Sequence, residues 1–145
     1  MASVVVYDAC VLYPQSLRDL LIRLAMTDLF QGRWSNEILD ECFRSILEKR
    51  PDLSADRLAR TRDLMNRAVR GCLVTGYETL IPGLQLPDLS DRHVLAAAIR
   101  CGAEVIVTTN IKDFPAESLA PFRVKAEHPD EFVLNLVDLD PATVL

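Results

Sequence analysis

Residues 88–115 read DLSDRHVLAAAIRCGAEVIVTTNIKDFP, and the spacing of apolar side chains changes within them. The first half has the period of an α-helix, which Asp88 or Ser90 would begin and Gly102 would end. Its apolar positions are Val94, Leu95, Ala98 and Ile99. Residues 104–108 then form a short continuous apolar run around Val105, Ile106 and Val107. Such a run is typical of a strand that is covered on both faces.

The same alternation continues on either side of this segment. Ser3–Tyr7 is a β-branched and aromatic run that predicts another buried strand. We expect helices from Pro14, from Ser35 to Pro51, from Ser54 to about residue 70, and over 129–136, with short strands within 74–86 and near 123–126. Strands that alternate with helices favour a parallel sheet with helices on both faces, which is an α/β fold.

Composition narrows the functional classes. The chain has 145 residues, half of them hydrophobic, without a linker or repeat, so we expect a single domain over residues 1–145. It contains no apolar run of the roughly 20 residues that span a bilayer, and the N-terminus lacks a basic leader, so we expect no membrane association and a cytoplasmic location. The net charge of −5 means that any surface for nucleic acid must be a local basic one.

The cysteines are scattered rather than paired. Their spacing excludes a zinc site of closely spaced ligands, and their apolar neighbours favour small buried side chains. They are Cys10, Cys42, Cys72 and Cys101.

Acidic and amide side chains follow the predicted strands. Asp8 comes directly after the first strand, and Asn110 and Asp113 follow the strand around Ile106. Asp91 lies in the first turn of the alanine-rich helix. In a parallel sheet the crevice beyond the carboxyl ends of the strands is the usual binding site, so these side chains could converge there.

Glu41 is a further candidate. At about 100° per residue, Glu41 lies roughly 60° beyond the edge of the apolar stripe set by Ile38, so its side chain could reach the border of the buried face. Carboxylates that share a small site raise one another's pKa, and a hard divalent cation such as Mg²⁺ relieves that repulsion. Each acid also has a structural reading: a turn former at Asp8, a helix cap at Asp91, a loop at Asp113 and a solvated surface group at Glu41.

Three segments resemble PIN-domain proteins, and most closely the VapC-like toxin components of prokaryotic toxin–antitoxin systems. They are VVVYDACVLYP (4–14), WSNEILDECFRSIL (34–47) and LPDLSDRHVLAAAIRCGAEVIVTTNIKDFP (86–115). The resemblance extends from Val4 to about Asp138. It implies an α/β/α sandwich with a mostly parallel, Rossmann-like sheet.

The resemblance also implies a metal-dependent endoribonuclease that hydrolyses RNA with metal-activated water. Asp8, Asp91 and Asp113 would then hold Mg²⁺ or Mn²⁺, and Glu41 would orient water or bind a second ion. Asn110 stands where some relatives have Asp, so the last residue of the metal site is either Asn110 or Asp113. Asp88 is an extra carboxylate to which the resemblance gives no role.

The implied partners are RNA, a small antitoxin and a second copy of the chain. Arg18 and Arg92 are the candidates for binding substrate phosphate, because both are expected near the crevice. Arg60 and Arg67 share a helix face that could bind phosphates or only be solvated. His93 could act as a general acid or base, but the metal mechanism does not require it, so a surface or packing role is favoured.

Two other functions fit parts of the pattern. A catalytically inactive PIN-like domain could serve as an RNA- or protein-binding module, but such a module does not need this set of acids. A phosphatase with an aspartate nucleophile usually has a second Asp two residues after the first, where this chain has Cys10.

Overall fold

The computed structural model describes residues 3–144 as a four-stranded, wholly parallel sheet flanked by helices. The strands are β1 (Ser3–Tyr7), β2 (Phe30–Arg33), β3 (Val105–Val107) and β4 (Lys125–Glu127), and they lie in the order β2-β1-β3-β4. Val5 pairs with Val105, and Val6 pairs with Ile106. The parallel sheet and the strands predicted around Val5 and Ile106 are confirmed.

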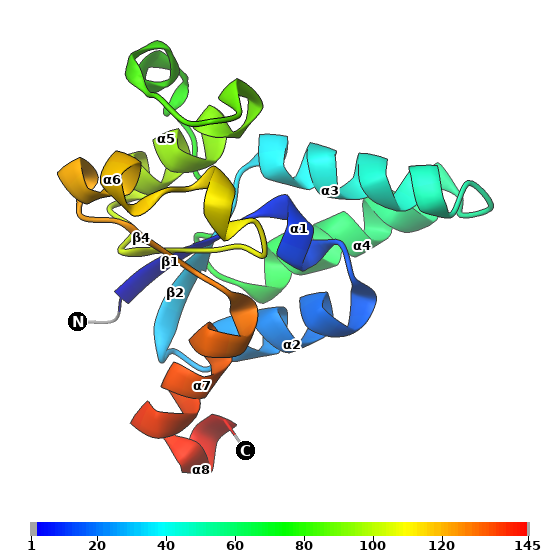
Figure 1. Ribbon diagram of the computed structural model, residues 1–145. Coiled ribbons are helices and arrows are strands. Elements are labelled where there is room, and N and C mark those ends of the chain that lie inside the picture. The colour runs from blue at the N-terminus through cyan, green and yellow to red at the C-terminus, as the bar shows by residue number, and fades with distance from the viewer. Residues whose placement is uncertain (1–2, 145) are drawn as a thin grey trace.

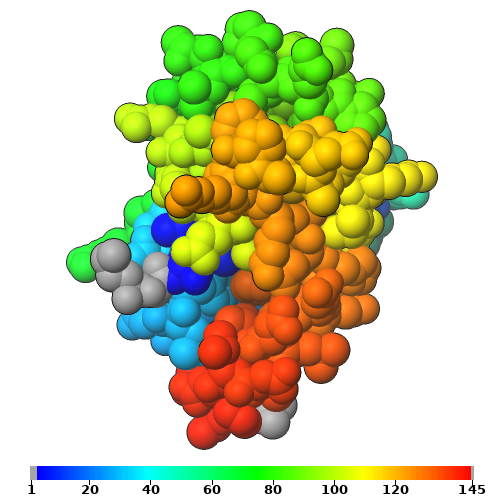
Figure 2. Space-filling view, turned by 60° about the vertical axis from the view of Figure 1, so that its left-hand side comes forward, coloured from blue at the N-terminus to red at the C-terminus, as the bar shows by residue number. Residues whose placement is uncertain are grey.

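Helices cover both faces of this sheet. Their bounds are α1 (Ala9–Leu12), α2 (Gln15–Ala25), α3 (Asn36–Lys49), α4 (Ala55–Ala68), α5 (Arg92–Cys101), α6 (Ala116–Leu119), α7 (Pro129–Leu139) and α8 (Pro141–Val144). Figure 1 shows α5 and α6 on one side of the strands and α2 and α7 on the other, which is the predicted α/β/α sandwich. On the face drawn in Figure 2, the chain after β3 runs from α6 down to α8. Within residues 3–144, no helix is long and apolar enough to cross a membrane.

The helix ends follow the capping residues in the sequence. The Ser35 side chain accepts a hydrogen bond from the backbone N–H of Ile38 (3.1 Å), and Ser54 does the same for Arg57 (3.1 Å). Gly102 ends α5 with a φ of 71°, a left-handed conformation that glycine adopts without strain. These caps confirm the beginnings of α3 and α4 and the end of α5.

One strand prediction is wrong. Residues 74–86 contain no strand in the described chain; instead, Leu73 makes a single bridge to Trp34, and a 3₁₀ turn (Glu78–Gly83) follows. The sheet instead gains β2, which contains Gly32. A Cβ atom at Gly32 would lie 2.9 Å from the Ala25 Cβ, so glycine lets α2 pack closely on the sheet.

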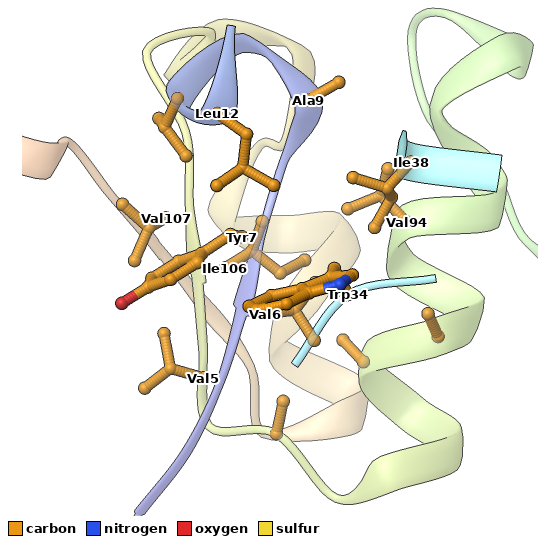
Figure 3. Close-up of a cluster of buried hydrophobic side chains, with 14 of the residues drawn as sticks. Val5, Val6, Tyr7, Ala9, Leu12, Trp34, Ile38, Val94, Ile106 and Val107 are labelled. Atoms are coloured by element: carbon orange, nitrogen blue, oxygen red, sulfur yellow. The ribbon is translucent and has the colours of Figure 1, made fainter. Parts of the chain in front are cut away.

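A buried aromatic cluster fixes β1 in place. The Tyr7 ring stacks on Trp34, with centroids 6.2 Å apart and an interplanar angle of 12°, and meets Phe30 and Phe132 edge-on. Figure 3 shows Tyr7 and Trp34 lying side by side next to β1. The Tyr7 hydroxyl also donates to the Leu21 carbonyl (2.9 Å). The end of β1, and therefore Asp8, is held by packing from several elements.

The strand order creates a crevice at one position. From β1 the chain proceeds to β2 on one side and later returns to β3 on the other side, so the order reverses between β1 and β3. In open parallel sheets, ligands bind beyond the carboxyl ends of the strands at such a point. Asp8 follows β1 there, and Asn110 lies shortly after β3.

Candidate active site at the carboxyl ends of β1 and β3

A pocket of about 380 Å³ lies at this reversal point. It is lined by Asp8, Ala9, Cys10, Tyr13, Glu41, Ser45, Glu48, Lys49, Asp91 and Asn110. These residues come from α1, from α3, from the turn that precedes α5 and from the loop after β3. The structure therefore brings Asp8, Glu41, Asp91 and Asn110 together from four separate segments.

Asp8 is the most enclosed of these acids. Its carboxylate accepts hydrogen bonds from the Ala9 backbone N–H (2.8 Å) and the Thr108 hydroxyl (2.9 Å). The Asp8 backbone N–H donates to the Val107 carbonyl (3.1 Å), which ties the residue to β3. Burial raises the pKa of Asp8 and the charge of Glu41 adds to the rise, while the hydrogen bonds oppose it in part. A buried carboxylate with a raised pKa is a group that a bound cation would stabilise.

Asp91 lies at the junction of a 3₁₀ turn (Leu89–Asp91) and α5, and is half-buried. Burial, followed by the charges of Asp8, Asp88, Asp113 and Glu41, raises the pKa of Asp91 to about 6. Asp91 occupies the N-cap position of α5, but its side chain makes no capping hydrogen bond. Asp88 caps the preceding 3₁₀ turn, because it accepts hydrogen bonds from the Ser90 N–H (2.9 Å) and hydroxyl (2.7 Å). The Asp91 side chain therefore lines the pocket without a capping hydrogen bond.

The raised pKa of Asp91 predicts a pH-dependent stability in EDTA. Because the folded pKa of about 6 exceeds the unfolded value of 3.8, the folded state binds this proton more tightly. The stabilisation is therefore complete below about pH 4 and is lost as pH rises through 6. We expect the unfolding free energy of the native protein, minus that of Asp91→Asn, to fall between pH 4 and 7. Urea denaturation of both proteins at several pH values measures this difference in unfolding free energy. A difference that stays constant or rises with pH would contradict a raised pKa for Asp91.

Glu41 is held by a residue from another helix. Its Oε1 is hydrogen-bonded to Nε2 of His93, which lies on α5 and is 4% exposed. Burial lowers the pKa of His93, but the hydrogen bond and charge of Glu41, with the charges of Glu37 and Asp8, outweigh it, so the net shift is upward. His93 Nδ1 is buried and has no hydrogen-bond partner in the described part of the chain. The surface role that the sequence left open for His93 is wrong, because His93 is buried, and its pairing with Glu41 was not predicted. A histidine among the apolar residues of α5 was the available signal.

Cys10 departs from the expectation of a buried apolar side chain. Its thiol lines the pocket, donates to an Asp8 carboxylate oxygen (3.5 Å) and lies 3.4 Å from the Thr108 hydroxyl. Burial and then the charge of Asp8 raise the pKa of the thiol, so the thiol keeps its proton at neutral pH. Cys42 and Cys72 are buried as expected, while Cys101 is half-buried.

Asn110 and Asp113 differ in their relation to the pocket. Asn110 lines the pocket, and its backbone N–H donates to the Thr108 hydroxyl (3.0 Å). Asp113 ends a 3₁₀ turn (Ile111–Asp113) and is not among the pocket-lining residues in the described chain, yet its charge contributes to the raised pKa of Asp91. Asn110 therefore lines the pocket itself, whereas Asp113 affects the pocket through the effect of its charge on the pKa of Asp91.

The predicted phosphate-binding arginines lie outside this pocket. Arg18 donates to the Leu12 and Tyr13 carbonyls (3.0 and 3.2 Å) and lines an adjoining groove. Arg92 donates to the Leu89 carbonyl (3.2 Å). Arg67 is paired with Asp63 at 3.0 Å on an exposed helix face, which matches the solvated reading of that face.

The chemistry of these donors fits a hard cation. The pocket presents carboxylate and amide oxygens, which Mg²⁺ and Mn²⁺ prefer. Over residues 3–144, no group of three or more His, Cys, Asp or Glu side chains is close enough to form a complete ligand set. Mg²⁺ usually takes only one or two carboxylates and keeps several waters, so an open arrangement of acids suits it.

Comparison with known proteins identifies the family. The sequence pattern of the PIN domain matches residues 2–112. The chain belongs to the PIN domain family. The matched part of this PIN domain contains Asp8, Glu41, Asp91 and Asn110.

One curated relative is similar over part of its length. The Mycobacterium tuberculosis (strain ATCC 25618 / H37Rv) protein named "Putative ribonuclease VapC50" is 55% identical to this PIN domain over 64 residues. That stretch covers 44% of this chain and 37% of the relative. The relative supports a likeness to VapC proteins.

Proposed function

We propose that this PIN domain is a divalent-metal-dependent endoribonuclease that hydrolyses phosphodiester bonds of RNA. The observation that carries the proposal is the convergence of Asp8, Glu41, Asp91 and Asn110 on one pocket at the reversal point of the sheet. The raised pKa values of Asp8 and Asp91 support it, because burial, with the charges of neighbouring acids added, disfavours their ionised forms and a bound cation would stabilise these forms. The name of the similar protein also points to a ribonuclease.

In this proposal the predicted acids and Asn110 have the following roles. Asp8 and Asp91 hold Mg²⁺ or Mn²⁺, with Asp113 acting directly or through water. Glu41 orients the attacking water or takes part in a second ion site, and Asn110 donates a hydrogen bond to a carboxylate or a phosphate oxygen. A bound cation supplies a lower pKa for water and positive charge beside the phosphoryl oxygens. Thr108 and Cys10 keep the Asp8 carboxylate in position through their hydrogen bonds.

The likeness to VapC proteins extends the proposal to partners. We infer that residues 1–145 form one PIN domain that acts as the toxin of a cytoplasmic toxin–antitoxin pair, is held inactive by a small antitoxin, and pairs with a second copy. Co-expression with a candidate small antitoxin, followed by measurement of the complex mass, tests this part separately from the chemistry.

Metal-linked stabilisation tests the site itself. We expect Mn²⁺ or Mg²⁺ to raise the melting temperature of the native protein, because a ligand that binds only the folded state stabilises it by about 2.7 kcal/mol at 100 times its Kd. RNA added with the metal should raise it further. Asp8→Asn should lose the metal-dependent shift, whereas Asp138→Asn, at an exposed carboxylate on α7, should keep it. An equal shift in Asp8→Asn, or none in the native protein, would favour an inactive PIN-like module.

A further inference from the structure

A groove adjoins the acidic pocket, and we call it the basic groove. It lies between the start of α2, the end of α3 and α4. Its lining residues are Tyr13, Pro14, Gln15, Arg18, Ile46, Lys49, Arg50, Leu53, Arg57, Leu58 and Thr61. Tyr13 and Lys49 line both the acidic pocket and the basic groove, so the two hollows border one another at these two side chains.

The charge of the basic groove is opposite to that of the pocket and of the chain as a whole. Its lining includes the cations Arg18, Lys49, Arg50 and Arg57 and, in the part of the chain that is described, no carboxylate. Asp52 neutralises Arg50 through an ion pair at 2.9 Å. Among the described residues, the Arg18 guanidinium donates to the uncharged Leu12 and Tyr13 carbonyls and forms no ion pair, so no carboxylate neutralises it. Within residues 3–144, neither Lys49 nor Arg57 forms an ion pair.

We infer that single-stranded RNA passes from the acidic pocket over Lys49 into the basic groove, where Arg18 and Arg57 bind its phosphates. This inference rests on the proposed function and adds the path of the substrate. The net charge of −5 disfavours RNA binding overall, so a phosphate backbone needs a local cluster of cations. Arg18, Lys49 and Arg57 line the basic groove and, within residues 3–144, form no ion pair, so they mark where that backbone can lie.

The uncharged part of the lining favours a single strand over a duplex. Tyr13 stands at the junction of the two hollows and is half-buried, as is Leu53 beside the cations, while Ile46 and Leu58 are buried beneath the groove. Unpaired bases can stack on aromatic rings and contact apolar surface, whereas the bases of an A-form duplex are enclosed. The groove therefore offers sites for bases and for phosphates along one track.

Arg57 gives the sharpest test because it lines the basic groove but not the acidic pocket. Arg60 is the matched control: it is also exposed on α4 and, among the described residues, lines neither hollow. Binding of a fluorescent single-stranded RNA 12-mer would be measured by anisotropy in Mg²⁺, with Asp8→Asn present throughout to prevent cleavage. Melting temperatures of all variants would confirm that each is folded.

We expect Arg57→Ser to weaken RNA binding about fivefold to tenfold. It should also reduce the slope of log Kd against log salt concentration by about 0.7, which is the value for the loss of one phosphate contact on a single strand. Arg60→Ser should change neither quantity. Equal binding by the two variants would overturn the path while leaving the acidic site and its metal binding intact. RNA binding that is absent in every variant, together with no metal-linked stabilisation, would overturn the proposed function itself.

Two competing ligands test whether single-stranded RNA is what binds in the basic groove. Poly-glutamate should not displace the RNA at equal charge concentration; if it does, the groove is a site for acidic polypeptides and the RNA assignment is wrong. A duplex of the same sequence should bind more weakly than the single strand. Equal binding of the duplex would overturn the role of the apolar lining and of Tyr13.

Discussion

Asp8→Asn should reduce Mg²⁺-dependent cleavage of a defined RNA pool by about two orders of magnitude or more. Loss of a single group that stabilises charge in the transition state typically has an effect of that size. Asparagine keeps an oxygen that accepts the Ala9 N–H and preserves the cap of α1, but it removes the charge that would hold the cation. Gel analysis of the RNA pool with the native protein and the variant measures this loss directly.

The stability of the same variant is its control. Because the pKa of Asp8 is raised in the folded protein, its ionised carboxylate opposes folding at neutral pH in the absence of metal. Asp8→Asn should therefore be at least as stable as the native protein in EDTA at pH 7. Cleavage that survives in a folded Asp8→Asn variant would remove the nuclease assignment from this cluster.

His93→Leu should lower Mn²⁺ affinity and RNA cleavage by about 10- to 100-fold, as is typical for groups that orient the residues of a metal site. His93 Nε2 holds the half-buried Glu41 side chain from across the α3–α5 interface. Leucine would leave Glu41 free to rotate. The leucine substitution would also remove the unpartnered His93 Nδ1 from the core. The loss of RNA cleavage should therefore not be accompanied by a matching loss of unfolding free energy.

A glutamine at position 93 distinguishes the role of His93 in holding Glu41 from its role in packing the core. In His93→Gln the amide nitrogen can replace Nε2 as the donor to Glu41, so metal affinity should be largely restored. His93→Leu should add little further loss to Glu41→Gln, because both changes break the same contact. Equal Mn²⁺ affinities for His93→Leu and the native protein would show that Glu41 does not depend on His93.

The fold was predictable where one kind of local signal dominated. The continuous apolar runs of β1 and β3 and the serine caps of α3 and α4 specify their elements without tertiary information. β2 was missed because its sequence, FQGR, has little strand character, and because Gly32 is explained only by the close approach of α2. The strand expected within 74–86 was wrong because Leu73 forms a single bridge and the chain then turns.

The sequence predicted which strands and helices carry the residues of the candidate site, but not the hydrogen bonds between those residues. Parallel strands place Asp8 and Asn110 at one edge, and the helical wheel gave the correct side of α3 for Glu41. The links from Glu41 to His93 and from Asp8 to Thr108 join residues far apart in the sequence, so local patterns carry little information about them. The same is true of Lys49, which borders the acids only because α3 passes beside α1.

Crystals of the native protein soaked in Mn²⁺ give the most direct measurement of the metal site. We predict an anomalous difference peak in the pocket, within ligand distance of the carboxylates of Asp8 and Asp91, and no such peak in Asp8→Asn crystals. An empty pocket at millimolar Mn²⁺, or a peak that is unchanged in the variant, would contradict the assignment of these acids as a metal site.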